Sequence, residues 1–188
     1  RDRFTELGLT GARLHRWGEV PVRFDRGPSS VKMVGPVERE IEFTTRAWGA
    51  GTDGPVRGLV VKEPKTMEEL EAVRDQLEGA WLLSKESRRR RNRDRDAAKA
   101  EREERKKVEE ALEGFTFLGK LRGSSRDEIT TGGVRGWREL TMETLPTEVE
   151  ITIRRQDYDA INSRLSDGEE VEIEADLKHY FTEGPFGV

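Results

Sequence analysis

The sequence lacks several features that whole classes of function require. It contains no cysteine, which excludes thiol nucleophiles, cysteine-ligated zinc and disulfides but leaves the redox compartment open. The longest wholly apolar runs have four residues, such as 80–83, whereas a membrane-spanning helix needs ~20. No transmembrane helix is therefore predicted. Only two histidines occur, His15 and His179, and neither has metal-ligand spacing around it, so we interpret both as structural or surface residues.

Charge is abundant, but it is not biased toward one sign. Charged residues make up 38% of the 188 residues and hydrophobic residues 33%, with a net charge of −4, against roughly 25% charged residues in typical globular proteins. We therefore expect one domain of ordinary size with a projecting element. The acidic balance argues against a dedicated nucleic-acid binder. Because the chain begins at Arg1 instead of Met, we expect a processed chain or an excised piece of a longer protein.

The first half of the sequence predicts strands before and after a capped helix. Extended sequence covers 20–45, where Val37, Arg39, Ile41 and Phe43 alternate with three glutamates, and a buried strand is predicted at 58–61. Thr66 and Glu69 form a capping box that begins a helix reaching about Leu77, and Gly79 separates this helix from a strand at 80–83. This order predicts a βαβ unit. The glycine-rich stretch 49–54 leads into Pro55 and a strand, so we do not expect a phosphate loop.

A highly charged segment follows at 85–112. Its first 26 residues, 85–110, hold twelve Lys or Arg and eight Asp or Glu, which predicts a long solvated helix. Only its end carries an apolar stripe, through Val108, Ala111, Leu112 and then Phe115. The run Arg88, Arg89, Arg90 and Arg91 is the sharpest basic patch and a possible interaction surface. Acidic residues follow it and no aromatic residues interleave with it, so nucleic acid is an unlikely partner.

The last third predicts a second crossover and a closing helix and strand. A strand is expected at 115–118, a loop at 123–147, a strand at 149–153, a helix at 156–165 and a half-buried strand at 171–177. The alternating glutamates of 170–176 are interpreted as a solvated strand face. In the loop, glycines surround Trp137, which either presents its ring to a ligand or partner or tucks into its own domain. Both alternatives stay open.

The closing residues carry a family resemblance. The strand and helix that contain Pro146, Ile151, Thr152, Asp157 and Ile161, followed by 167–174 and 179–186, resemble the end of a protease-associated domain. The likeness is to the domain inserted in secreted zinc exopeptidases of the plasma glutamate carboxypeptidase (carboxypeptidase Q) and bacterial aminopeptidase type. It extends over 18–188, with departures at 113–115 and in the length of the charged helix.

The resemblance implies a fold and a role. It implies an α+β fold, a β-sandwich or open β-barrel flanked by helices, with residues 1–17 as an arm from a preceding catalytic domain and 18–188 as the protease-associated domain. The role implied is a lid, substrate-access or protein-interaction element of a secreted, periplasmic or cell-envelope peptidase. Its partners would be the parent peptidase domain and a peptide substrate or protein. We expect no catalytic, cofactor or metal residues in this chain, and zinc in the parent's catalytic domain.

Two other hypotheses remain. The chain could be a stand-alone interaction module that binds an acidic partner or nucleic acid through the helix at 85–112. It could instead be an unrecognised hydrolase that combines its carboxylates with His179. The first would show steep salt dependence of binding, and the second would need a concave site that holds these groups together.

Overall fold

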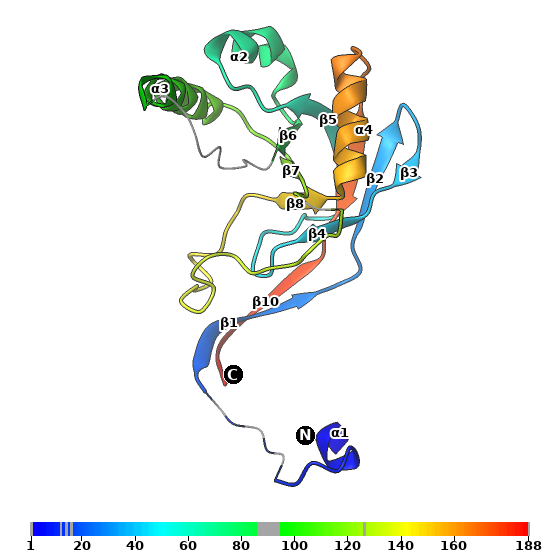
Figure 1. The fold of residues 1–188 in the computed structure, drawn as a ribbon, viewed down its shortest axis with the longest axis vertical. Coiled ribbons are helices and arrows are strands. Elements are labelled where there is room, and N and C mark those ends of the chain that lie inside the picture. Colours follow the sequence, from blue (N-terminus) through cyan, green and yellow to red (C-terminus); the bar gives the residue numbers. More distant parts are fainter. Residues whose placement is uncertain are drawn as a thin grey trace.

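The computed structural model describes residues 2–11, 13, 15, 17–85, 95–125 and 127–187, and shows an α+β chain built on one curled mixed sheet (Figure 1). The elements in chain order are α1 (Asp2–Glu6), β1 (Glu19–Arg26), β2 (Ser30–Gly35), β3 (Arg39–Glu40), β4 (Phe43–Thr45), β5 (Val56–Lys62), α2 (Met67–Val73), a 3-10 turn (Arg74–Gln76), β6 (Trp81–Lys85), α3 (Arg95–Leu112), β7 (Gly119–Gly123), β8 (Glu150–Ile153), α4 (Arg155–Ser166), β9 (Glu172–Asp176) and β10 (His179–Gly187).

The eight-stranded sheet has the order β3-β2-β9-β5-β6-β7-β8-β4. Its centre, β5-β6-β7-β8, is parallel, and the flanking strands pair antiparallel. The helices α2 and α3 connect parallel neighbours, so both predicted βα crossovers are confirmed. The sheet curls into an open half-barrel, so the expected α+β class is confirmed, whereas the protease-associated form of that fold stays a prediction.

Side chains of the central strands point alternately to the two faces of the sheet, and each face has its own hydrophobic core. Trp81 and Leu83 face the inner core beside α4, whereas Leu82 faces a second cluster beneath α2 and α3. The inner core also holds Leu121, Ile151, Ile153, Ile161 and Ile173, all fully buried. The second cluster includes Val108 of α3, as the apolar stripe at the end of that helix predicted. Each layer of helices therefore covers its own face of the sheet.

Local signals located the helices correctly. Thr66 Oγ1 accepts a hydrogen bond from the Glu69 backbone N–H at 3.1 Å, and the Glu69 carboxylate accepts one from the Lys65 N–H at 2.7 Å. The capping box is thus confirmed, although its return bond reaches Lys65 rather than Thr66 itself. Gly79 has a φ of 68°, the left-handed conformation that ends the helical segment before β6.

Three sequence predictions were wrong in their bounds. The strand expected at 115–118 begins at Gly119, because Phe115 and Phe117 pack into the second cluster after α3. The strand expected over 37–43 is divided into β3 and β4, with Ile41 buried between them. The chain does not finish on the 171–177 strand, since β10 follows it directly. In each case a contact with a distant segment sets the boundary.

Candidate functional site

Strands β1 and β10 form a separate antiparallel ribbon that leaves the sheet (Figure 1). Their register runs from Arg26↔His179 beside the sheet to Glu19↔Gly187 at the far end. The ribbon continues two sheet strands, because β1 leads into β2, β9 leads into β10, and β2 pairs with β9. The first and last described strands therefore lie side by side.

An aromatic cluster lies where the ribbon meets the sheet. Phe24 of β1 has its ring centroid 5.1 Å from His179, 5.7 Å from Phe181 and 5.7 Å from Trp48. Trp48 stacks on Trp137 with a centroid separation of 4.5 Å and an interplanar angle of 22°. Offset aromatic contacts of this kind contribute ~0.5–1.5 kcal/mol each beyond area burial. The cluster joins the ribbon, the segment after β4 and the long loop before β8.

Trp48 is held in an unusual backbone conformation. Its φ of 61° is the only positive value among the described residues other than glycine, and bulky side chains rarely adopt it. The indole Nε1–H donates to the Val22 carbonyl of β1 at 2.9 Å. The Ala47 N–H donates to the Gly132 carbonyl at 2.8 Å, which ties this segment to the loop. These contacts offset the backbone strain and direct the ring onto the ribbon.

Trp137 therefore tucks against its own domain, one of the two alternatives left open by its sequence. Its outer neighbour is Arg138, whose guanidinium carbon lies 5.1 Å from the Trp137 ring centroid and 4.7 Å from that of Trp17. Trp17 is 61% exposed and Met142 is 44% exposed. Arg138 and Met142 also line a cavity of about 280 Å³ against the ribbon. Trp17, Trp137, Arg138 and Met142 are called the ribbon patch below.

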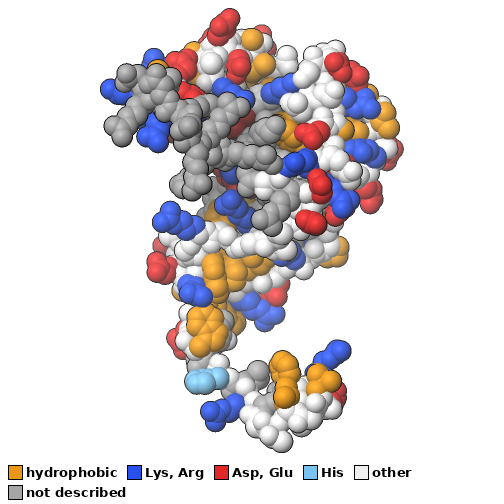
Figure 2. Space-filling model, in the orientation of Figure 1, with side chains coloured by type: hydrophobic (Ala, Val, Ile, Leu, Met, Phe, Trp, Pro, Cys, Tyr) orange, Lys and Arg blue, Asp and Glu red, His pale blue; other side chains and the backbone are white. Residues whose placement is uncertain are grey.

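Figure 2 shows hydrophobic side chains gathered on this part of the molecule, next to Lys and Arg side chains. A surface that joins exposed aromatics with a guanidinium is typical of protein interfaces, which are enriched in Trp, Tyr, Met and Arg. The ribbon patch was not foreseen in full. The sequence signal was the glycine-rich loop around Trp137, but nothing local indicated that Trp17 and Arg138 would meet there.

His179 connects the ribbon to β4. Its Nδ1 lies 2.8 Å from the Gly49 carbonyl oxygen, which can only accept, so Nδ1 carries the proton. Its Nε2 then accepts from the Thr45 hydroxyl at 3.0 Å. Burial lowers the pKa of His179, and nearby Arg26 acts in the same direction. One ring nitrogen thus contacts a carbonyl and the other a hydroxyl, and these contacts position the ribbon. Neither partner is a carboxylate of the kind that orients a histidine for general-base chemistry.

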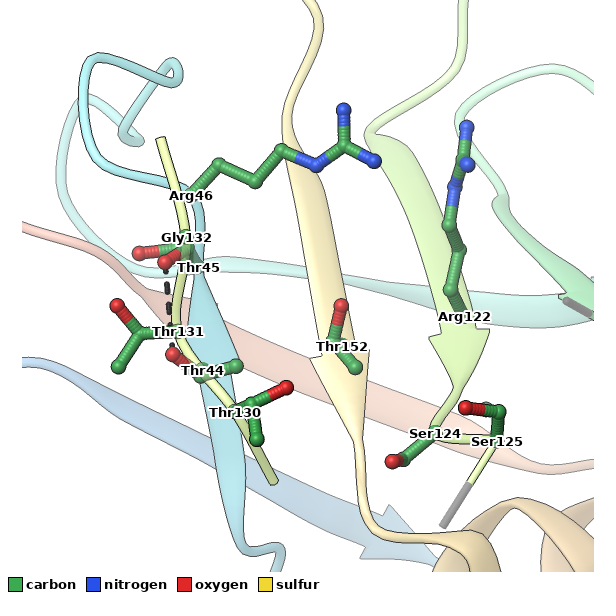
Figure 3. A pocket seen from close by; sticks show the side chains of 11 residues that line it. Thr44, Thr45, Arg46, Arg122, Ser124, Ser125, Thr130, Thr131, Gly132 and Thr152 are labelled. Atoms are coloured by element: carbon green, nitrogen blue, oxygen red, sulfur yellow. Dashed lines mark hydrogen bonds between the residues drawn. The ribbon is translucent and has the colours of Figure 1, made fainter. Parts of the chain in front are cut away.

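A polar pocket of about 240 Å³ opens on the face of β4, β8 and β7 that lies opposite the inner core (Figure 3). Thr44, Thr152 and Arg122 occupy paired register positions and so share one row on this face. Glu150, in the next row, pairs with Arg122 Nη2 at 2.5 Å and with Arg46 Nη1 at 3.8 Å. The pocket is lined by Thr44, Thr45, Arg46, Arg122, Gly123, Ser124, Ser125, Thr130, Thr131, Gly132 and Thr152.

The predicted basic surface is described only in part. Arg88, Arg89, Arg90 and Arg91 lie outside the described residues. Helix α3 itself carries six basic and six acidic residues, several of them paired on its own surface, as in Arg105–Glu109 at 2.8 Å. The residues of α3 therefore carry no net charge.

No group of three or more His, Asp or Glu residues within the described ranges could hold a metal ion. No helix in this part of the chain is long and apolar enough to cross a membrane.

Comparison with known proteins gives similarity at the level of fold. No protein-family profile and no curated protein sequence matches the chain. Among solved structures, it is similar to a peptidase M28 precursor from Shewanella amazonensis, with a TM-score of 0.56, 18% identity, and coverage of 99% of this chain and 42% of that one. It is also similar to an aminopeptidase from Aneurinibacillus sp. strain AM-1, with a TM-score of 0.52, 13% identity, and coverage of 88% and 35%. The chain spans less than half the length of either peptidase.

Proposed function

We propose that this chain is a non-catalytic accessory domain of an M28-type zinc exopeptidase, of the protease-associated kind. It serves as a lid, substrate-access or protein-contact element beside the catalytic domain. The observation that carries the proposal is the fold shared, over nearly the whole chain, with part of a larger peptidase. Fold alone does not assign activity, so the proposal also depends on two features of the surface.

The first feature is the ribbon. A domain inserted into another must enter and leave at neighbouring points, and the pairing of Glu19 with Gly187 brings the two connections together. A two-stranded ribbon is narrow and is marginally stable without packing. The catalytic domain would supply that packing at the far end, and the ribbon would set the angle between the two domains.

The second feature is the ribbon patch. Its exposed Trp17 and Met142, with the guanidinium of Arg138 between two indole rings, lie beside the ribbon and so face the position proposed for the catalytic domain. Desolvated aromatic and arginine side chains at such a position contribute strongly to interfaces. We infer that the patch contacts the catalytic domain or the substrate that approaches it.

Zinc would belong to the rest of the proposed protein. The described residues do not bring together a ligand set for it, so no step of peptide hydrolysis is derived through this chain. A secreted, periplasmic or cell-envelope location follows from the proposed family alone. The stand-alone interaction module is the second candidate, but the balanced charge of α3 does not favour it.

The test compares the protein encoded by the complete reading frame with the chain 1–188 alone. We expect the complete protein to hydrolyse aminoacyl p-nitroanilides in a zinc-dependent manner and the chain alone to be inactive. Trp137→Ala and Arg138→Gln, introduced together in the complete protein, should raise KM or lower kcat several-fold. Lys99→Gln in exposed α3 is the matched control and should change neither.

Three results would overturn the proposal. One is hydrolysis by the metal-loaded chain alone at the rate of the complete protein. Another is a complete reading frame without a peptidase domain. The third is unchanged kinetics in the double variant, which would separate the ribbon patch from function even if the parent is a peptidase.

A further inference from the structure

We propose that the polar pocket on β4, β8 and β7 binds a single carboxylate group of a peptide, with Arg46 as the side chain that moves onto it. Arg122 and the hydroxyl of Thr152 would complete the contacts. The inference does not rest on the proposed function, because binding is measured on this chain itself.

The pocket wall has the chemistry of an oxyanion site. Two guanidiniums and seven hydroxyl side chains line it, and its described lining includes no carboxylate. Figure 3 shows Arg46 and Arg122 on either side of Thr152, with both guanidiniums toward the same end of the pocket. Arginine binds carboxylates through paired N–H donors, and hydroxyls add further donors without adding charge. The set therefore matches a small anion with several acceptor atoms.

The charges around the pocket favour a ligand group with a single negative charge. Arg46 and Arg122 share one counter-charge, Glu150, so one positive charge is left over. A carboxylate carries one negative charge, whereas a phosphate group carries about 1.5 to 2 near neutral pH. The cavity of about 240 Å³ is smaller than the ~300–1,000 Å³ of ordinary small-molecule sites. It accommodates a carboxylate with one small residue behind it.

The two arginines differ in how firmly they are held. Arg122 Nη2 lies 2.5 Å from Glu150, whereas Arg46 Nη1 lies 3.8 Å away and the Arg46 side chain is 52% exposed. An exposed pair this long contributes little to stability, so Arg46 can leave Glu150 for a ligand at small cost. Arg122 Nε is buried and has no hydrogen-bond partner among the described residues. This nitrogen is closed to solvent, so a carboxylate in the pocket would meet the exposed part of the Arg122 side chain, which is 37% exposed.

The experiment titrates chain 1–188 with N-acetyl-Gly-Gly-Ala as its free acid and as its C-terminal amide, followed by NMR or calorimetry at low salt. We expect the acid to bind at least ~10-fold more tightly than the amide, the effect of one charge-assisted contact. N-acetyl-Gly-Asp-Gly amide tests whether a side-chain carboxylate serves as well as a terminal one. Binding of either carboxylate peptide in preference to the neutral amide supports the proposal and names the source.

Variants then locate the site. Arg46→Gln should weaken binding of the acid by ~10-fold or more, and Thr152→Val, which keeps the side-chain volume, should weaken it several-fold. Arg57→Gln is the matched control, because Arg57 is also 52% exposed and pairs with a strand glutamate, Glu172, away from the pocket. It should leave binding unchanged.

The proposal is overturned if the acid and the amide bind alike, or if neither binds at 50 mM. It is also overturned if Arg46→Gln binds the acid as tightly as the native chain, or if Arg57→Gln weakens binding as much as Arg46→Gln does. Inorganic phosphate that binds more tightly than the acid would show that the pocket is a phosphate site and not a carboxylate site.

Discussion

The sheet body and the ribbon are stabilised in different ways. In the body, aliphatic side chains and Trp81 are fully buried on a mixed sheet whose parallel centre is covered by helices on both faces. In the ribbon, half-buried rings contact one another and guanidiniums lie over them, as Arg26 does 5.2 Å from the Phe24 ring centroid. Burial gives the body a large, non-directional stabilisation, whereas the ribbon depends on a few directional contacts.

The difference between the two regions indicates where the molecule can move. Regions with few buried apolar contacts open at lower free energy than the core does. The ribbon, His179 and the ribbon patch all belong to such a region, and it is also the region proposed to meet a second domain. The following changes test whether the two regions really respond separately.

The largest effect is expected from Trp81→Ala in the body. Trp81 is 0% exposed, and its Nε1–H donates to the Ile173 carbonyl at 3.1 Å. The cavity and the unpaired carbonyl should lower the free energy of unfolding by ~3–5 kcal/mol, measured by urea denaturation. Trp137→Ala, at a half-buried indole, is the matched control and should cost clearly less. Equal losses would remove the distinction between the regions.

A smaller and local effect is expected from Phe24→Ala in the ribbon. Loss of its contacts with Trp48, His179 and Phe181 should cost ~1–2 kcal/mol. Hydrogen exchange should accelerate at the paired amides of β1 and β10 and stay unchanged in β7. Faster exchange throughout the sheet would show that the ribbon and the body unfold as one unit.

Acid should loosen the ribbon through His179. Because burial lowers its folded-state pKa below the ordinary 6.5, the unfolded chain takes up the proton first as pH falls. The contribution of His179 to stability is therefore complete above pH 6.5 and declines as pH drops below it. The difference in Tm between the native chain and His179→Gln should shrink from pH 7.5 to pH 5. A difference that is constant or grows over this range would contradict the assignment.

The smallest effect is expected from the exposed pairs of α3. Lys106 Nζ lies 3.3 Å from Glu110, with both side chains more than half exposed. Lys106→Gln should change the free energy of unfolding by no more than ~0.5 kcal/mol. Val108→Ala, in the same helix but 2% exposed, should cost more. The pair of variants is compared by thermal denaturation, and a reversed order would mean that charge and not burial anchors this helix.

The features that the sequence predicted correctly are those that neighbouring residues determine. Thr66 and Glu69 marked the start of a helix, and the alternation around Val171 and Ile173 marked a half-buried strand, because capping and side-chain period are local properties. The ribbon could not be predicted, since Glu19 and Gly187 meet only through the whole fold. The same holds for the stacking of Trp48 on Trp137 and for the row that joins Thr44, Thr152 and Arg122.

The antiparallel ribbon also has a mechanical consequence. Its hydrogen bonds lie perpendicular to the strands, and Glu19 and Gly187 occupy the same end. A tension that draws these two residues apart therefore loads one pair of bonds at a time, as in opening a zipper. Such a tension would open the ribbon pair by pair down to Phe24 and His179, where the ring contacts of Phe24 add resistance before the sheet is loaded.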